Sequence, residues 1–378
     1  MYNSSKFVAH LYAFLIEHKT TRLNRSTSFP TSMKTIDLRS DTVTQPTDEM
    51  IDAIVQAHKS GRFGDDVSGE DEVVNELQEK AAKILGKESA LLVTSGTQGN
   101  VISLLAQASP GDEVVIEERS HTNLYEAGAM SSLGGLFPKP VTSVRGYILP
   151  QTLEEAINHD DAHLARTAMV VIENTHNYAG GTIITPNQVK ALTSVAREHG
   201  LKIHCDGARL FNAAVALDVP AKKLVEDVDS VQICLSKGLS APVGSIIAGT
   251  EEFIHDGHRI RKRLGGGMRQ AGIIAAPMIV ALEKMVDRLK DDHDNARLLY
   301  DRLHDIPGLA IDKPDTNILF LGLDNLPFDT MKLSEELAKE NILIYGKYGT
   351  RARMVLNRMV DRDDTVRVAE VLNKILRV

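Results

Sequence analysis

The feature that most restricts the fold of this sequence is a regular alternation of short apolar runs with longer amphipathic segments. Such short runs fit strands buried on both faces of a sheet, and the longer segments fit the helices that connect parallel strands. We expect strands at residues 89–95, 113–118, 167–175, 202–206, 230–236 and 244–249. Helices are expected between them, including residues 72–85, 97–108, 152–158 and 187–199. This order predicts an α/β layered fold with a mostly parallel central sheet.

The length of the chain is sufficient for about two domains. We expect an N-terminal extension at residues 1–33, an N-terminal arm at 34–47, a large domain at 48–276 and a smaller C-terminal α/β domain at 277–378. The small domain is expected to contain a long helix at 277–305, strands near 316–322 and 353–356, and a final helix near 362–376. No linker rich in proline and glycine separates the domains, so we expect a helix to join them.

Charge and cysteine content exclude several classes of partner. The net charge of -8 argues against nucleic acid, because domains that bind phosphate backbones usually carry a basic surplus. The apolar run from Phe7 to Ile16 is too short to span a bilayer, so no membrane association is expected. Cys205 and Cys234 lack the spacing of a disulfide framework or a zinc site, which favours a reducing compartment, by default the cytoplasm. The basic, serine-rich extension is also compatible with a mitochondrial presequence, a disordered tail or a start at Met33.

Polar residues follow the ends of the expected strands, where ligands bind in open α/β sheets. In "VTSGTQGN" a strand enters a turn and then a helix, so Gly96, Thr97 and the unpaired N–H groups of the helix could hold an anion. An ordinary helix cap by Ser95 or Thr97 is the alternative. In "KIHCDGARLFN" Asp206 ends a strand and Arg209 follows, which fits either a salt bridge or a carboxylate that pairs with a protonated ring nitrogen.

Lys237 interrupts an apolar pattern at the end of another expected strand, in "CLSKGLSAP". A lysine whose pKa is depressed by burial or by a neighbouring cation can attack a carbonyl and form a Schiff base, although a structural ion pair is also possible. Together, an anion cradle, a carboxylate and such a lysine match the needs of pyridoxal 5'-phosphate for a phosphate anchor, a partner for its ring nitrogen and a covalent link.

Residues 35–378 resemble the low-specificity threonine aldolases, which are pyridoxal-phosphate enzymes of the aspartate-aminotransferase fold, called fold type I. The resemblance rests on a set of segments: "IDLRSDTVTQPT", "GDDVSGED", "SGTQGN", "IENTHN", "HCDGARLFNA", "CLSKGLSAPVGS", "LGGGMRQAG" and "KMVDRLKDDHDNA". It implies cleavage of L-threonine, L-allo-threonine or a related β-hydroxy-α-amino acid to glycine and an aldehyde. No metal site is expected, because no histidine or carboxylate cluster has ligand spacing in the sequence.

The resemblance also implies roles for single residues. Lys237 is implied as the Schiff-base lysine and Asp206 as the partner of the pyridine nitrogen. His121 is implied to stack on the cofactor ring, and His176 to approach the β-hydroxyl of the substrate, with His121 as the rival for moving that proton. Other residues implied in binding are Gly96, Thr97 and Ser236 for the phosphate, and Arg209 for the substrate carboxylate or a cofactor hydroxyl.

Further residues would complete the site from distant parts of the sequence. Ser40 and Arg353 are implied to bind the substrate carboxylate, with Arg351 as the alternative arginine. Arg269 is implied to reach the cofactor phosphate of a neighbouring subunit, and Lys262 to line the shared site, which requires a homodimer or homotetramer. Without the resemblance, the "HRIRKRLGGGMRQAG" segment is typical of a solvated basic helix ended by glycine.

The chain departs from the pattern of these enzymes at three positions. Ser68 replaces a tyrosine, Asn357 replaces a histidine, and Tyr178 stands where a small or basic residue is usual. These departures leave substrate preference and stereoselectivity open. A β-eliminating lyase that uses the same cofactor is the rival enzyme, and a cofactor-free homologue with a binding role is a second alternative.

Overall fold

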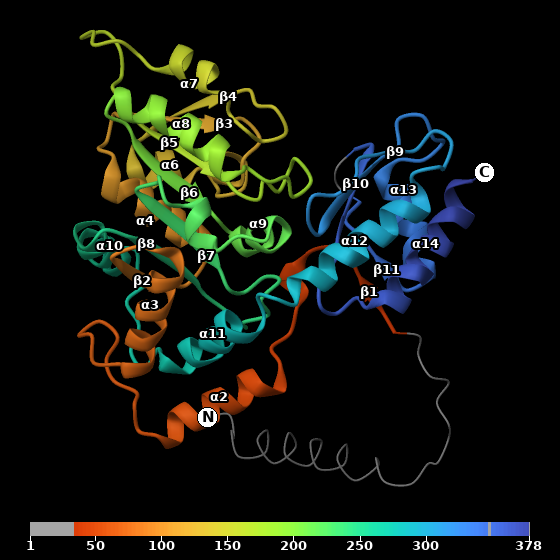
Figure 1. Ribbon diagram of the computed structural model, residues 1–378, viewed down its shortest axis with the longest axis horizontal. Helices are drawn as coiled ribbons and strands as arrows, with labels where there is room; N and C mark the ends of the chain where they lie inside the picture. Colours follow the sequence, from red (N-terminus) through yellow and green to blue (C-terminus); the bar gives the residue numbers. More distant parts are fainter. Residues whose placement is uncertain (1–33, 347–348, 378) are drawn as a thin grey trace, which may run out of the picture. The chain divides into compact units, whose positions relative to one another are not determined.

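The computed structural model describes residues 34–346 and 349–377, and residues 36–377 belong to one compact unit (Figure 1). The three hypotheses for residues 1–33 fall outside the described residues. In the described chain the main sheet has the order β2-β8-β7-β6-β5-β3-β4. Its strands are β2 (Ser89–Val93), β3 (Glu113–Glu117), β4 (Phe137–Val141), β5 (Thr167–Glu173), β6 (Lys202–Asp206), β7 (Ser230–Cys234) and β8 (Ser245–Gly249).

The sheet is mostly parallel, which confirms the expected α/β fold. Only β8, among these strands, runs antiparallel to its neighbours β2 and β7. One strand, β4, was not expected, because its sequence "FPKPV" contains Pro138 and Pro140. Proline cannot donate to a ladder and is therefore confined to sheet edges, and β4 is an edge strand that pairs with β3 alone.

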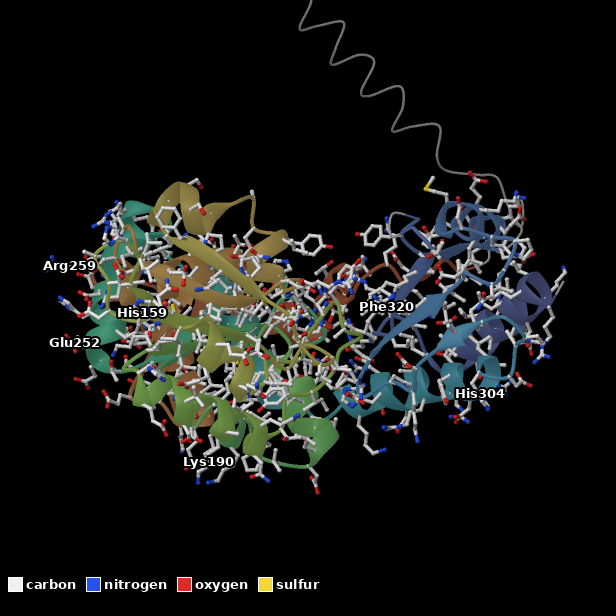
Figure 2. All side chains as sticks on the ribbon, turned by 90° about the horizontal axis from the view of Figure 1, so that it is seen from above. His159, Lys190, Glu252, Arg259, His304 and Phe320 are labelled. Carbon is white, nitrogen blue, oxygen red and sulfur yellow. The ribbon has the colours of Figure 1, made fainter. Side chains whose placement is uncertain are left out.

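Helices cover both faces of the main sheet, because alternate residues of each strand point to opposite faces. Ala90 and Leu92 of β2 belong to one apolar core, whereas Leu91 and Val93 belong to another. The first face is covered by α3 (Glu72–Leu85), α7 (Pro150–Ala156), α8 (Pro186–Glu198), α9 (Leu210–Leu217) and α11 (Gly272–Lys284). The other face is covered by α4 (Gly96–Gln107), α6 (Ala129–Gly134) and α10 (Glu251–Arg263). Figure 2 shows Lys190 of α8 and Arg259 of α10 at the outer surface.

The C-terminal part forms a separate core around two small sheets. One sheet is antiparallel and has the order β12-β10-β9, and the other pairs β1 with β11 in parallel. The strands are β1 (Ile36–Asp37), β9 (Ala310–Ile311), β10 (Ile318–Gly322), β11 (Ile342–Leu343) and β12 (Arg351–Val355). The helices beside them are α12 (Leu289–Leu303), α13 (Thr330–Lys339) and α14 (Arg362–Leu376). The remaining elements are η1 (Asp41–Val43), α2 (Asp48–Lys59), α5 (His121–Leu124) and η2 (Ala221–Leu224).

The long helix expected at residues 277–305 is instead two helices, α11 and α12. The apolar side chains of α11 and the first residue of α12, Leu289, pack in the larger core, whereas those from Ala296 onward pack in the smaller one. The break between the two helices therefore lies within the larger core, where Met285 and Leu289 both pack. The change of core falls within α12, later than the expected boundary at residue 277, and neither glycine nor proline marks the break at residues 285–288.

Candidate active site

A cleft of about 190 Å³ brings together segments from most of the chain. Its lining consists of Ser40, Thr42, His121, Tyr125, Asn177, Arg209, Lys237 and Arg353. The segments that carry His121, Asn177, Arg209 and Lys237 all follow the carboxyl ends of parallel strands. Five of the residues expected from the sequence line this cleft: Ser40, His121, Arg209, Lys237 and Arg353.

Lys237 lies just beyond β7, in a turn that fixes its backbone. Its carbonyl oxygen accepts hydrogen bonds from Thr44 Oγ1 at 2.7 Å and from the N–H of Ser240 at 2.9 Å. Its side chain is half-buried and lines the cleft. Because both bonds hold the backbone carbonyl of Lys237, its side chain starts from a fixed point at the end of the sheet.

Asp206, at the end of β6, lies behind the cleft and is 2% exposed. Its Oδ2 accepts from Asn100 Nδ2 at 2.8 Å and from Thr122 Oγ1 at 3.3 Å, and its Oδ1 accepts from the N–H of Ala208 at 3.1 Å. Burial by itself would raise the pKa of Asp206, but the charges of Lys237 and His121 keep that pKa below its ordinary value. The carboxylate therefore stays ionised in a buried position.

Arg209 forms a bidentate ion pair with Asp41, which sequence reasoning missed. Arg209 Nε and Nη2 each lie 2.7 Å from an oxygen of Asp41, which is completely buried. Burial opposes the charge of Asp41, but Arg209 keeps the pKa of the carboxyl below its ordinary value. Because Nε and Nη2 of Arg209 both bond Asp41, its remaining Nη1 group is directed toward Asn177 Oδ1, at 3.5 Å. The site thus orients this guanidinium before any substrate binds.

Arg353 and Arg351 lie in different cavities. Arg353 Nη1 donates to Asn177 Oδ1 at 2.8 Å and its Nη2 donates to the carbonyl of Arg39 at 3.1 Å, at the wall of the Lys237 cleft. Arg351 instead lies over the ring of Phe320, at 4.4 Å, in a second cavity (Figure 2 labels Phe320). Of the two arginines, Arg353 is therefore the one placed to bind a carboxylate in the Lys237 cleft.

His121 begins α5 and is paired with a buried carboxylate. Its Nδ1 lies 3.1 Å from Glu126 Oε1, and its backbone N–H donates to Glu173 Oε2 at 2.6 Å. Burial lowers the pKa of His121, but Glu126 and Asp206 outweigh this effect and raise it above its ordinary value. Glu126 thus orients the ring and makes it a stronger base.

His176 is only 1% exposed and does not line the Lys237 cleft. Its Nε2 lies 2.9 Å from Glu117 Oε2, and its Nδ1 accepts from the N–H of Ala179 at 3.2 Å. It borders the second cavity, of about 230 Å³, together with Arg119, Tyr178 and Arg351. The structure therefore does not bring His176 together with Lys237 and His121.

The first turn of α4 is where the sequence predicted an anion cradle or, as the alternative, an ordinary helix cap, and the structure shows the cap. Ser95 caps this helix, because its Oγ accepts from the N–H of Gln98 at 3.2 Å. A Cβ atom at Gly96 would lie 2.8 Å from Cys234 Sγ, so the helix begins in direct contact with the end of β7. Thr97 and Ser236 are both half-buried at these two ends. The sequence predicted the phosphate site at this corner, which lies at the end of β7, three residues before Lys237.

Arg269 and Lys262 lie outside the cleft of their own chain. The side chain of Arg269 is 66% exposed and its Nη1 bonds Asp65 Oδ2 at 2.6 Å. Lys262 and Ser68 are exposed too. The loop that carries Ser68 packs against the loop that carries Arg269, because the N–H of Asp66 donates to the carbonyl of Arg269 at 3.0 Å. One exposed surface therefore carries two of the expected binding residues, Arg269 and Lys262, and also Ser68, where the chain departs from the family pattern.

The other two positions at which the chain departs from the family pattern, Tyr178 and Asn357, do not lie on this exposed surface. Tyr178 lies in the second cavity, with the guanidinium carbon of Arg119 at 3.8 Å from its ring centre. Asn357 is completely buried, and its Nδ2 donates to the carbonyls of Asp37 and Val355, each at 3.2 Å. Asn357 therefore holds the backbone of the smaller core together and does not line the cleft.

One group of metal-ligand type does form in three dimensions, although the sequence shows no such spacing. Single ligand atoms of His121, Glu126 and Asp206 lie within 4.8 Å of one another. Asn100 Nδ2 already donates to both carboxylates, at 2.8 Å each. A cation here would have to compete with this amide, and the group is better described as a hydrogen-bond network.

Sequence reasoning missed five partners of the expected residues, of which all but the half-buried Asn177 are buried: Asp41, Asn100, Glu117, Glu126 and Asn177. Asp41 and Asn177 lie inside quoted segments, "LRSD" and "THN", directly after residues that were singled out. Polar residues beside a predicted site residue were the available signal for these two. Glu117, the last residue of β3, and Glu126 carry no such local signal.

Similarity to known proteins agrees with this geometry. The family described as Beta-eliminating lyase matches residues 37–325. Low-specificity L-threonine aldolase 1 of Arabidopsis thaliana is 40% identical over 339 residues, which cover 88% of this chain and 94% of the relative. The low specificity L-threonine aldolase of Escherichia coli strain K12 is 40% identical over 337 residues, which cover 88% and 97%.

The fold is also found among solved structures. The structure of Leishmania major threonine aldolase matches with a TM-score of 0.77 at 18% identity, covering 90% of this chain and 99% of that chain. At such low identity the likeness carries the fold alone.

Proposed function

We infer that this chain is a lyase that cleaves L-threonine, L-allo-threonine or a related β-hydroxy-α-amino acid to glycine and an aldehyde. The chain belongs to the beta-eliminating lyase family, and the two curated relatives named above are low-specificity L-threonine aldolases. The family and the threonine aldolases use pyridoxal phosphate. The observation that carries the proposal is the cleft in which Lys237, His121 and Arg353 meet in front of the ionised Asp206.

The described residues fit this cofactor. The N-terminus of α4, with Thr97 and Ser236 beside it, suits a phosphate, and Asp206 suits a protonated ring nitrogen. The amine of Lys237 is the group for the covalent link. When bound, the cofactor's ring accepts the electron pair released at the substrate's α-carbon.

The chain's own residues supply binding and proton transfer. Arg353, with Asn177, is placed to bind the substrate carboxylate, as a guanidinium pairs well with a planar anion. His121 takes the proton of the β-hydroxyl as the Cα–Cβ bond breaks, because it lines the cleft and Glu126 raises its pKa. The aldehyde leaves, and protonation of the α-carbon gives glycine. His176 supports carboxylate binding indirectly, because it holds the turn that carries Asn177, the partner of Arg353.

The two possible reactions of this family are distinguished by their products. We expect the purified protein with pyridoxal phosphate to release acetaldehyde and glycine in equal amounts from L-threonine and L-allo-threonine. A β-eliminating lyase would instead release pyruvate and ammonia from serine or cysteine. The appearance of those products without any retro-aldol product would replace the aldolase assignment with elimination.

We also propose that two subunits share each site. The support is that Arg269, on a loop, and Lys262, in the last turn of α10, are exposed outside the cleft of their own chain, together with the need of a phosphate for a cationic partner. Mixing Lys237→Ala chains with Arg269→Ala chains should restore part of the activity, because one site of each mixed dimer then has both intact residues. Mixed dimers as inactive as both parents would contradict sharing.

The location proposed is a compartment that keeps thiols reduced, by default the cytoplasm, since Cys205 and Cys234 are both free and buried. No helix in residues 34–346 and 349–377 combines the length and apolarity needed to cross a membrane.

A further inference from the structure

Buried side chains form a chain of hydrogen bonds that ends on Asp206. Gln107 Nε2 lies 2.6 Å from Ser230 Oγ, which lies 2.8 Å from His204 Nδ1. On the other side of the imidazole, His204 Nε2 lies 3.1 Å from Asn100 Oδ1. Asn100 Nδ2 then reaches Asp206 Oδ2 at 2.8 Å. Asn100, His204 and Ser230 are all at most 1% exposed, so the three bonds from Ser230 to Asp206 form away from water, whereas Gln107 is half-buried.

The direction of every bond in this chain is determined. An ionised Asp206 can only accept, so the side of the Asn100 amide that faces it must be the NH₂ group, and the carbonyl side faces His204. His204 therefore donates from Nε2. Burial lowers the pKa of His204 to about 4, so the ring is neutral near pH 7 and its Nδ1 accepts. The hydroxyl of Ser230 donates to that Nδ1 and itself accepts from Gln107.

We propose that Asn100 and His204 are positioning residues for Asp206, which hold its carboxylate ionised and fixed in orientation through one directed chain of hydrogen bonds. The inference rests on the proposed function, in which Asp206 pairs with the cofactor's ring nitrogen. Asn100 holds Oδ2 and the N–H of Ala208 holds Oδ1, so the carboxylate cannot rotate. Aligned bonds in a low-dielectric interior also strengthen one another, so a donor as distant as Ser230 contributes.

Ser230→Ala is the most conservative test, with Ser103→Ala as its matched control. Both serines are completely buried, but within the described residues the hydroxyl of Ser103 has no hydrogen-bond partner. Ser230→Ala leaves Nδ1 of His204 without a donor, whereas Ser103→Ala removes no bond. In titrations of the apoprotein with pyridoxal phosphate, we expect a dissociation constant about tenfold higher for Ser230→Ala and an unchanged one for Ser103→Ala.

The pH dependence of cofactor binding separates positioning from a general loss of packing. Loss of this series of hydrogen bonds raises the pKa of Asp206. As the pH is lowered, the affinity for pyridoxal phosphate should therefore begin to fall at a higher pH in Ser230→Ala than in the wild type. The other charged groups that face Asp206, namely Lys237, His121 and Glu126, are the same in both proteins. Ser103→Ala should keep the wild-type profile.

A second pair of variants changes His204, at the centre of the series of hydrogen bonds. His204→Leu removes the donor to Asn100, whereas the amide of His204→Gln can still donate to it. We expect weaker cofactor binding in His204→Leu than in His204→Gln, with melting temperatures measured by circular dichroism as the check on folding. If His204→Leu does not fold, Ser230→Ala and His204→Gln decide the question.

The outcomes separate this inference from the proposed function. If the wild type binds the cofactor and cleaves threonine while Ser230→Ala and both His204 variants bind it as well as Ser103→Ala does, the positioning role is overturned and the proposed function stands. If the wild type does not bind pyridoxal phosphate, both are overturned.

Discussion

Two histidines of the described residues, His121 and His176, each pair with a buried glutamate, and the two pairs differ in whether the second ring nitrogen of the histidine is bonded. His121 lies 3.1 Å from Glu126, and His176 lies 2.9 Å from Glu117. Nε2 of His121 has no hydrogen-bond partner in the described part of the chain, and its ring lines the Lys237 cleft. Both nitrogens of His176 are bonded. The same pair of residues can therefore serve proton transfer or hold a turn, depending on whether the second nitrogen is free.

A single carboxylate connects the two loops that carry these histidines. Glu173, at the end of β5, accepts from the N–H of His121 at 2.6 Å and from the N–H of Asn177 at 2.8 Å. Through Asn177 the His176 turn contacts Arg353. We call His176–Glu117 the closed pair, because both nitrogens of its ring are bonded, and His121–Glu126 the open pair. The closed pair thus positions the end of the cleft at which we propose that the substrate carboxylate binds, while the open pair faces the proposed reaction.

The largest expected effect is on activity at the open pair. His121→Asn removes the proposed base, and the loss of general base catalysis should lower kcat for threonine cleavage by about 10²–10⁴-fold. The measurement is steady-state kinetics with aldehyde detection. His176→Asn should affect KM more than kcat, because His176 supports the binding of the carboxylate. A larger fall in kcat for His176→Asn than for His121→Asn would reverse the assigned roles.

The second effect is on stability at the closed pair. His176→Asn leaves the buried Glu117 without its imidazole partner, which should cost about 3 kcal/mol of unfolding free energy. Urea unfolding followed by circular dichroism measures this quantity. His121→Asn, at a ring that is 36% exposed, serves as the control and should cost clearly less. Equal costs at both histidines would remove the distinction between an open and a closed pair.

The third effect is on stability and concerns the packing of Gly146 against the ring of His176. A Cβ atom at Gly146 would lie 2.5 Å from Cγ of His176, at a backbone φ of +86°. Gly61 has a φ of +70°, but nothing lies within 4 Å of its Cβ position. Gly146→Ala should therefore destabilise the protein by about 2 kcal/mol more than Gly61→Ala, since overpacking adds to the shared backbone strain. The same unfolding experiment tests this difference, and equal losses would mean that the ring is free to move.

The smallest expected effect is a shift in pH dependence. Glu126 raises the pKa of His121, so Glu126→Gln should lower it. A base must be unprotonated to act, and the acidic limb of the kcat profile should then move to lower pH. The profile of Glu117→Gln should keep its acidic midpoint. A shift to higher pH in Glu126→Gln would contradict the pairing of Glu126 with the catalytic imidazole.

The sequence predicted the sheet well because its signals are local. The bounds of β6 and α14 follow from the apolar pattern and from turn residues, and the rule that ligands bind at strand ends located Lys237 and Asp206. By contrast, the pairing of Arg209 with Asp41 joins residues 168 positions apart. No local pattern encodes such a contact.

The environment of His176 was equally inaccessible from the sequence. Its position after a strand and inside a family motif favoured the cleft. Which side of the turn its ring occupies depends on Glu117 from β3 and on the absence of a side chain at Gly146. Both are tertiary contacts, so the motif could locate the residue but not its orientation.

The joining of the N-terminal arm to the last part of the small core has a consequence for how the protein matures on the ribosome. The N–H of Leu38 donates to the carbonyl of Leu343, and the N–H of Val355 donates to the carbonyl of Leu38. Ser40 is made early but can take its place in the cleft only after β12, with Arg353, has been synthesised. A chain interrupted before this strand would contain Lys237 and Asp206 but lack Arg353, the group that we propose binds the substrate carboxylate, so synthesis must pass β12 before the cleft can hold an amino acid.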